Sequence, residues 1–230
     1  MNDDRLTRRG SLLKVGGLLG AALGAGAWKP AESDGAGPAG VASGAVSCIL
    51  TPEQTEGPYY IPGEKVRRNI TEGRPGTPLL LRTTVVNAST CRAIRNAAVD
   101  IWHADAAGIY SGFGDGAGNR TFMRGIQRTN ARGLATFQTV YPGWYQGRTV
   151  HIHVKVHLGG NVVHTGQLYF PDSVTDAVYR KAPYTNRPNR TTRNADDSIY
   201  RNGGRRSLVK VRKNASGVYL ATITMGVTRS

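Results

Sequence analysis

From residue 46 onward, the chain alternates short apolar runs with turn-forming sequences, a pattern typical of β-strands. The runs are rich in Val, Thr, Ile and Tyr, and turn signals such as NARG, LGGN and KNASG separate them. Short strands joined by glycine-rich loops predict one all-β domain, either a sandwich or a barrel. We expect strands at residues 79–88, 97–106, 133–142, 148–158, 161–170, 207–213 and 217–227.

One helix interrupts this pattern and is expected at residues 173–182. Ser173 can cap its start, Asp176 lies three residues further on, and Pro183 can end it. No internal repeat is found, so residues 46–230 are expected to form a single domain.

Two of the five histidines, His151 and His153, lie in the expected strand at 148–158. Residues i and i+2 of a strand point to the same face, so the two imidazoles converge as two ligands of one metal would. Taken alone, the pair fits two ordinary polar strand residues equally well.

Two tyrosines change this balance. Tyr145 lies six residues before His151, and Tyr110 ends the segment DIWHADAAGIY. The tyrosine hydroxyl has a reference pKa of about 10 and is seldom a ligand, but a hard trivalent metal can displace its proton. Two phenolates and two imidazoles would form a mixed oxygen and nitrogen donor set with two negative charges, which suits Fe(III) better than Zn(II) or Cu(II).

Together these segments resemble the intradiol ring-cleavage dioxygenases, the family of protocatechuate 3,4-dioxygenase and catechol 1,2-dioxygenase. The resemblance implies an all-β, immunoglobulin-like or prealbumin-like β-sandwich with long loops and one short helix. It also implies a non-haem Fe(III) with four ligands, which are Tyr110, Tyr145, His151 and His153. In YPGWY the family's ligand is the last residue, so Tyr141 is expected only to pack. The matching stretches are residues 51–60, 99–110, 137–156 and 166–170.

The resemblance assigns further roles. Arg148 matches an arginine beside the substrate, where its charge can stabilise an anionic intermediate. Gln167 matches a glutamine behind the iron, and a three-residue turn at 159–161 would put it opposite His153. Four residues match positions that line the substrate cleft, although Trp102 by itself would be an ordinary core residue; they are Gly57, Pro58, Tyr59 and Trp102. Three histidines match no ligand position and are expected on the surface or in packing; they are His103, His157 and His164.

The implied activity is cleavage of a catechol between its two hydroxyl-bearing carbons, with O₂ as co-substrate and a cis,cis-muconate as product. Tyr145 would also leave the metal and help to take a substrate proton. Gln146 and Gly147 follow Tyr145 where protocatechuate enzymes place a tryptophan, so the identity of the catechol stays open. One alternative is a non-catalytic exported β-sandwich module that binds an anionic polymer. Another is a cupin-type metal enzyme, although VKVHLGGN lacks the glutamate that cupins need.

The first 45 residues are typical of an export signal and a linker. Arg8 and Arg9 precede the apolar run VGGLLGAALGAGA, and AGA at 25–27 fits an A-x-A cleavage site. Residues 1–27 therefore predict a twin-arginine signal, with an uncleaved membrane anchor as the alternative. Residues 28–45 are rich in Pro and Gly and predict a flexible linker. We expect an exported, periplasmic or secreted protein without stable membrane insertion after cleavage.

The formal net charge is +15, and the basic residues gather late in the chain. Such a charge can attract nucleic acid, an anionic envelope or an anionic substrate, while a solvated basic surface is the simpler interpretation. We expect no nucleic-acid partner, because an exported protein seldom meets one and no binding module is recognisable. Cys48 and Cys91 suit one disulfide in an oxidising compartment, with two unpaired thiols as the alternative. A homo-oligomer is an open alternative to a monomer.

Overall fold

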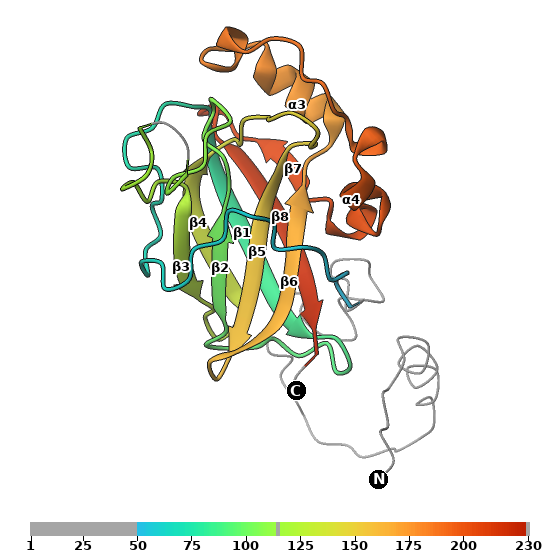
Figure 1. The fold of residues 1–230 in the computed structure, drawn as a ribbon. Coiled ribbons are helices and arrows are strands. Elements are labelled where there is room, and N and C mark those ends of the chain that lie inside the picture. Colours follow the sequence, from blue (N-terminus) through green and yellow to red (C-terminus); the bar gives the residue numbers. More distant parts are fainter. Residues whose placement is uncertain (1–49, 114–115, 229–230) are drawn as a thin grey trace, which may run out of the picture.

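The computed structural model describes residues 50–113 and 116–228, in which two four-stranded sheets lie face to face (Figure 1). The first sheet has the order β4 (Leu134–Val140), β1 (Pro78–Asn87), β8 (Tyr219–Val227) and β7 (Lys210–Lys213). The second has the order β3 (Arg124–Arg128), β2 (Ala98–Trp102), β5 (His151–Leu158) and β6 (Asn161–Tyr169). Within each sheet neighbouring strands are antiparallel, except for the parallel pair of β1 and β8. The predicted all-β sandwich is confirmed.

The hydrophobic core lies between the two sheets and is built from alternate residues of their strands. On β5 the even-numbered residues Ile152, Val154 and Val156 are fully buried in this core. Burial of each such side chain contributes about 1.5–3 kcal/mol. The odd-numbered residues of β5 consequently point to the other side of the sheet, where His151 and His153 are buried as well. Both faces of β5 are therefore covered.

The cover on the outer face is formed by residues 50–61, which we call the strap. Figure 1 shows the chain just after residue 50 crossing in front of β2, β5 and β6. The backbone amide of Gln54 donates to the carbonyl of Thr165 on β6 at 2.9 Å, and Glu56 forms an ion pair with Lys155 on β5. The outer face of this sheet thereby becomes a second, polar interior.

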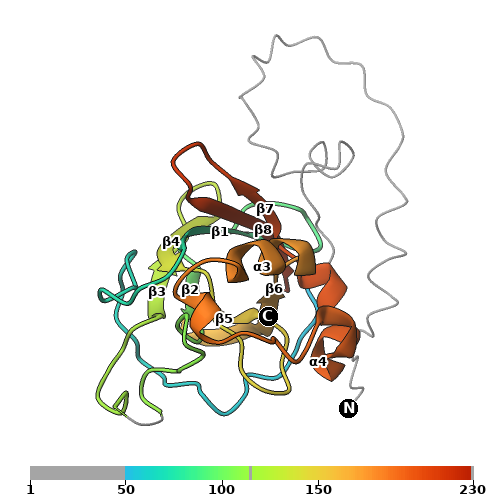
Figure 2. The same ribbon diagram turned by 90° about the horizontal axis from the view of Figure 1, so that it is seen from above.

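Short helices close one end of the sandwich. Figure 2 looks down on the end that α3 (Asp172–Tyr179) covers. The remaining helical segments are η1 (Tyr184–Asn186), η2 (Asn194–Asp196), α4 (Ser198–Arg201) and η3 (Gly204–Ser207). Among the described residues, no helix is both long and apolar enough to cross a bilayer.

The predicted helix exists, but the prediction that Ser173 caps it is wrong. The helix begins at Asp172, and its N-cap position is Pro171, which makes no side-chain capping bond. The Asp172 carboxylate instead binds the guanidinium of Arg190 at 2.5 Å, so a tertiary ion pair fixes this end. The helix ends at Tyr179, before Pro183.

The strands differ from the expected ones in several places. Those expected at 148–158 and 207–213 begin only at His151 and Lys210. The expected strand at 97–106 ends at Trp102, and β3 was not predicted because its sequence, RGIQR, has no apolar alternation. The expected pairing of His153 with Gln167 is present. It arises from a two-residue turn at 159–160 together with a register shift between Val156 and His157, not from a three-residue turn.

Candidate metal centre

Four aromatic side chains meet on the outer face of β5, beneath the strap. His151 and His153 come from the start of β5, Tyr145 from the loop before it, and Tyr110 from the loop after β2. The ring centroids of Tyr110 and Tyr145 are 5.7 Å apart, as are those of Tyr145 and His151. The centroids of His151 and His153 are 4.6 Å apart, and those of Tyr110 and His153 are 6.0 Å apart. The four predicted ligands therefore form one closed group.

The two imidazoles turn the same nitrogen toward a common point. Nδ1–H of His151 donates to the carbonyl of Thr149 at 2.7 Å, which leaves its Nε2 as the lone-pair nitrogen. That Nε2 lies 3.0 Å from Nε2 of His153 and 3.1 Å from the hydroxyl of Tyr145. Burial, reinforced by the charge of Arg148, lowers the pKa of His151 to about 3. Burial and the neighbouring His151 hold the pKa of His153 well below its usual range, so both imidazoles are neutral, as metal ligands must be.

The two phenols differ in their access to solvent. Tyr110 is buried, and its hydroxyl has no hydrogen-bond partner among the described residues. Tyr145 is half-buried and borders the solvent. Burial raises the pKa of both phenols; the proximity of Tyr145 adds to the effect at Tyr110, while Arg148 opposes it at Tyr145. Both would stay protonated in the absence of a strong Lewis acid.

These donors fit a hard, highly charged metal. The described residues contain no group of three or more His, Cys, Asp or Glu side chains able to hold one, so the protein donors available beside the two histidines here are the tyrosines. A buried phenol without a partner, beside two neutral imidazoles that share a focus, offers oxygen and nitrogen donors that become satisfied on coordination. Two phenolates would balance two of the charges of Fe(III), and the predicted iron therefore suits the residues present.

Three residues form the wall around the ligand rings. Trp102 is buried and stacks on His153, with centroids 4.9 Å apart and planes inclined by 7°. Tyr59 stacks on Tyr110 at 4.3 Å and 18°. A Cβ atom on Gly57 would lie 3.1 Å from Cε1 of His153, so the strap backbone packs directly on this ring. Roles in substrate binding for these residues and the exposed Pro58 stay predictions.

Arg148 lies at the solvent side of the group and is held by two residues. Its Nε donates to the carboxylate of Asp197 at 2.8 Å, and its Nη2 donates to Oε1 of Gln167. Its Nη1 lies 3.4 Å from Nε2 of His151. Gln167 is itself fixed, because its Nε2 donates to the carbonyl of Thr55 in the strap at 2.9 Å. The guanidinium is thus held next to the ligand group, and its predicted place beside a substrate stays a prediction.

Asp197 is the main functional candidate that the sequence did not reveal. It is 1% exposed and caps α4, accepting hydrogen bonds from the amides of Ile199 and Tyr200. Burial alone would raise its pKa, but hydrogen bonds from Tyr200, Thr149 and Arg148 outweigh this effect and lower it. The only sequence signal was an Asp before Ser-Ile-Tyr, a short-helix start that says nothing about Arg148.

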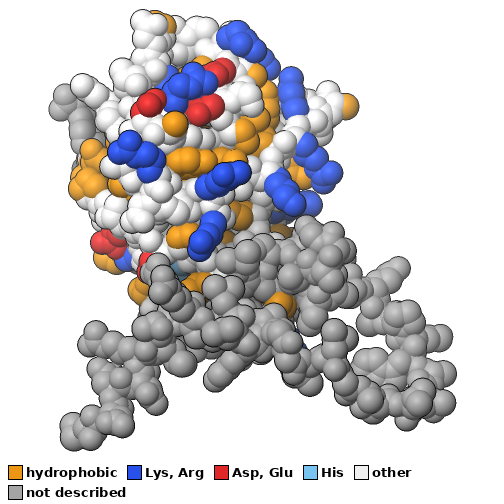
Figure 3. Space-filling model, turned by 90° about the vertical axis from the view of Figure 1, so that its right-hand side faces the viewer, with side chains coloured by type: hydrophobic (Ala, Val, Ile, Leu, Met, Phe, Trp, Pro, Cys, Tyr) orange, Lys and Arg blue, Asp and Glu red, His pale blue; other side chains and the backbone are white. Residues whose placement is uncertain are grey.

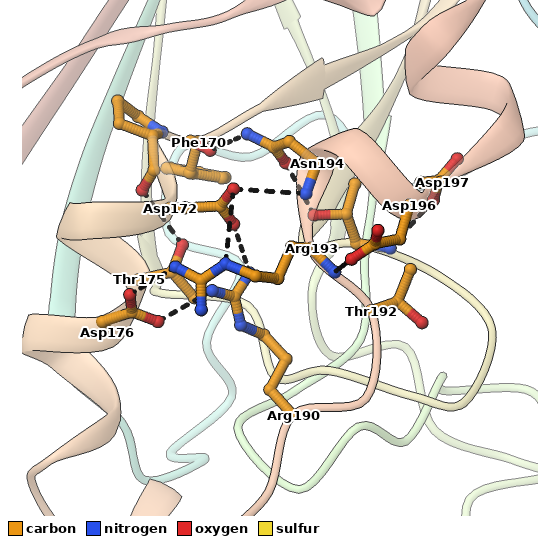
Figure 4. Close-up of polar contacts among 12 residues, drawn as sticks. Phe170, Asp172, Thr175, Asp176, Arg190, Thr192, Arg193, Asn194, Asp196 and Asp197 are labelled. Atoms are coloured by element: carbon orange, nitrogen blue, oxygen red, sulfur yellow. Dashed lines mark hydrogen bonds and ion pairs between the residues drawn. The ribbon is translucent and has the colours of Figure 1, made fainter.

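A polar network holds the segment that delivers Asp197 (Figure 4). The carboxylate of Asp172 accepts hydrogen bonds from Arg190 at 2.5 Å and from the amide of Asn194 at 3.3 Å. The side chain of Asn194 in turn accepts from the Thr149 hydroxyl at 2.6 Å. The start of α3 and the entry to β5 are thereby tied together, which places Asp197 within reach of Arg148.

The remaining residues singled out in the sequence lie outside the ligand group. Tyr141 is fully buried, its hydroxyl is 2.8 Å from that of Thr175, and it takes no part in the ligand group, as expected. His103 is buried, and its ring nitrogens contact the Ala104 carbonyl and the Thr139 hydroxyl, each at 2.8 Å. His164 is buried beside Glu53, while His157 is half-buried. Cys48, like the signal and linker at residues 1–45, lies outside the described residues, so its pairing with Cys91 stays a prediction.

Known proteins are similar to this chain in sequence and in fold. A family model described as "Dioxygenase" matches residues 55–182, more than half of the chain. The intradiol ring-cleavage dioxygenase from Tetranychus urticae superposes with a TM-score of 0.75 at 36% identity, covering 78% of this chain and 94% of that one. A dioxygenase domain from Streptomyces sp. SirexAA-E reaches 0.59 at 31% identity, over 79% of this chain and 99% of that one. The chain belongs to the intradiol ring-cleavage dioxygenase family.

Relatives that are named catechol or chlorocatechol 1,2-dioxygenases match a smaller part of this chain. Catechol 1,2-dioxygenase 1 of Acinetobacter lwoffii is 31% identical over 101 residues, which is 41% of this chain and 32% of that protein. A chlorocatechol 1,2-dioxygenase of Pseudomonas putida is 28% identical over 136 residues, 50% of this chain and 52% of that protein. The chain therefore spans between about a third and a half of the length of these relatives.

Proposed function

We propose that this protein is a non-haem Fe(III) intradiol dioxygenase that cleaves a catechol-type ring between its two hydroxyl-bearing carbons. Both atoms of O₂ enter the product, a cis,cis-muconate, and the catechol itself supplies all the electrons. The observation that carries the proposal is the group of two phenols and two neutral imidazoles beneath the strap. Membership of the family and similarity to catechol 1,2-dioxygenases support it.

Tyr110, Tyr145, His151 and His153 would hold the iron. Bound Fe(III) would supply a Lewis acid that coordinates both catechol oxygens and draws electron density from the ring. Tyr110 and the histidines are buried and suit a fixed role as ligands, whereas Tyr145 borders the solvent. The phenolate oxygen of Tyr145 would accept a proton from a catechol hydroxyl.

Arg148 would act on the charge of the bound substrate. Its guanidinium is fixed by Asp197 and Gln167 next to the ligand group, so it need not reorganise when negative charge develops on the ring. Tyr59 is partly exposed beside Tyr145, and it and the exposed Pro58 that precedes it would form the wall that the ring contacts. The substrate would enter beside Tyr59 and Tyr145, which are partly exposed, whereas Trp102 is buried against His153.

The ligand assignment is tested by iron reconstitution and visible spectroscopy. The iron-loaded protein should bind one iron per chain and show a red-brown phenolate-to-Fe(III) band. Tyr110→Phe and Tyr145→Phe should each weaken or shift this band, because each removes one phenolate. Tyr141→Phe is the matched control, since Tyr141 is buried and hydrogen-bonded but outside the group. A colourless iron-loaded protein would sink the assignment.

The activity is tested by oxygen uptake against catechol, protocatechuate, hydroxyquinol and substituted catechols, with product spectra. One O₂ should disappear per ring cleaved. A non-catalytic module for anionic polymer would show neither stoichiometric iron nor catechol-dependent oxygen uptake. Such a result would favour that module instead.

We also propose export through residues 1–27, on the sequence of this segment alone. Replacing both Arg8 and Arg9 by lysine should leave the precursor inside the cell, since twin-arginine signals need both guanidinium groups. Fractionation of cells that express the two forms measures the effect. Equal export of both would contradict the proposed route.

A further inference from the structure

Arg124 is a buried arginine beside the ligand group that the proposed chemistry does not use. It lies on β3, paired with Trp102 of β2, and its side chain is 1% exposed. Glu64 places a carboxylate oxygen 3.8 Å from its Nε. Burying a guanidinium is costly unless its donors are satisfied. Hydrogen bonds to its other partners must therefore compensate for the burial of the Arg124 guanidinium.

Those partners lie on two separate loops. Nη1 of Arg124 donates to the carbonyl of Tyr59 in the strap at 2.7 Å. Nη2 donates to the carbonyl of Ser111 at 2.6 Å, and Nε donates to the Ser111 hydroxyl at 2.9 Å. The Ser111 hydroxyl donates onward to the carbonyl of Phe122 at 2.6 Å. One guanidinium thus joins the strap to the loop that carries Tyr110.

The joined segments carry the two stacked rings. Ser111 directly follows Tyr110, and Arg124 binds the backbone of both Tyr59 and Ser111. The ring of Tyr59 lies 4.3 Å from that of Tyr110 and meets Tyr145 edge-on at 6.2 Å. Tyr59 therefore touches both tyrosines of the ligand group, and its distance from them depends on where the strap is held.

We propose that Arg124 is a positioning residue of the dioxygenase centre, which holds the strap against the Tyr110 loop so that Tyr59 stacks on the ligand ring. The inference rests on the proposed function. Arg124 acts through the backbone of Tyr59 and Ser111. An arginine is required because its planar fork reaches acceptors on both loops at once, whereas a lysine ammonium is a single point.

The test compares iron-loaded wild type with Arg124→Lys, Arg124→Met and Ser111→Ala. Both Arg124 variants should show a displaced phenolate-to-iron band and a KM for catechol about tenfold higher, with a smaller change in kcat. Arg124→Lys keeps the charge, so an equal effect in both variants assigns the role to the bridge. Ser111→Ala removes the hydroxyl that accepts from Arg124 and donates to Phe122, but keeps the carbonyl that accepts from Nη2 of Arg124. It should move the band and KM in the same direction by less.

Arg82→Lys is the control, because Arg82 lies exposed on β1 in the other sheet. It should leave the band and KM unchanged. Thermal unfolding of the metal-free proteins shows which variants are folded. If the Arg124 variants do not fold, the band and KM of Ser111→Ala test the role of the bridge. Suppose that the wild type shows the phenolate-to-iron band, and that the Arg124 and Ser111 variants have the same band and KM as Arg82→Lys. This result would overturn the role of Arg124. Wild type without iron or band would overturn the proposed function, and this inference with it.

Discussion

At the scale of single residues, the strap meets the ligand group at Gly57. Its φ of +71° lies in the left-handed region, and its missing Cβ leaves room for the His153 ring. Gly57→Ala should therefore cost about 1 kcal/mol in backbone strain and also push on His153. We expect weaker iron binding in a chelator competition as well as a lower free energy of unfolding.

Gly63→Ala is the matched control for this effect. Gly63 has a similar φ of +78°, but a Cβ there would meet nothing within 4 Å. It should lose similar stability without any change in iron affinity. If both variants bind iron equally well, the contact between Gly57 and His153 has no functional weight.

Asp197 illustrates a residue whose role depends on long-range contacts. Asp197→Asn keeps an oxygen for the cap of α4 but removes the charge that holds Arg148. We expect kcat/KM for catechol to fall by about tenfold or more, and the free energy of unfolding to fall by about 1–3 kcal/mol.

The neighbouring Asp196→Asn provides the comparison. Asp196 is exposed, and its carboxylate accepts a hydrogen bond from the backbone amide of Arg193 at 3.3 Å. Steady-state kinetics on both variants should show a loss for Asp197→Asn alone. Similar kinetics in the two would contradict a role for Asp197 in orienting Arg148.

At the scale of elements, the outer face of β2 and β5 holds buried polar groups. Asp100 on β2 is 1% exposed, and one of its carboxylate oxygens has no partner among the described residues. Burial raises its pKa from 3.8 to about 7, although the hydrogen bond from Tyr60 acts against this. The charged and titratable groups around it are Glu56, Tyr60, Glu64, Arg124 and Lys155.

This shift predicts how stability depends on pH. Between pH 3.8 and about 7, the folded state keeps a proton on Asp100 that the unfolded state has lost. The free energy of unfolding should therefore fall as pH rises through this window. Asp100→Asn cannot ionise, so its stability relative to wild type should grow by about 2–3 kcal/mol between pH 5 and pH 8. Denaturant unfolding of the metal-free proteins measures this, and a constant difference would refute it.

Sequence reasoning worked where elements carry a local pattern. The core-facing residues of β5 alternate with polar ones, so the shared face of His151 and His153 could be predicted. It failed for β3, whose residues are ordered by neighbours and not by their own apolar pattern. It also could not find Asp197, because 49 residues separate it from Arg148 along the chain. The capping error at Ser173 has the same origin, an ion pair from a later segment.

At the scale of the whole molecule, the basic surface charge includes residues on an edge strand of the sandwich, β7. Val66 bridges to β3 and Asn69 to β4, whereas β7, with the sequence KVRK, ends its sheet. Charged residues on an edge strand discourage pairing with another chain. Figure 3 shows blue Lys and Arg side chains spread over one side, with few acidic ones among them. A solvated basic surface stays the simpler interpretation of these residues, with an anionic polymer partner as the alternative.

The same charge should nevertheless act on the substrate. A net charge of +15 attracts anions and raises their concentration near the protein, and salt screens this attraction. Protocatechuate carries a carboxylate at neutral pH, whereas catechol is uncharged. If both are cleaved, kcat/KM for protocatechuate should fall between about two- and tenfold from low salt to 0.5 M NaCl, while that for catechol should stay constant. Initial rates of oxygen uptake at the two ionic strengths give both ratios. An equal response of the two substrates would contradict an influence of the basic surface on the capture of anionic substrates.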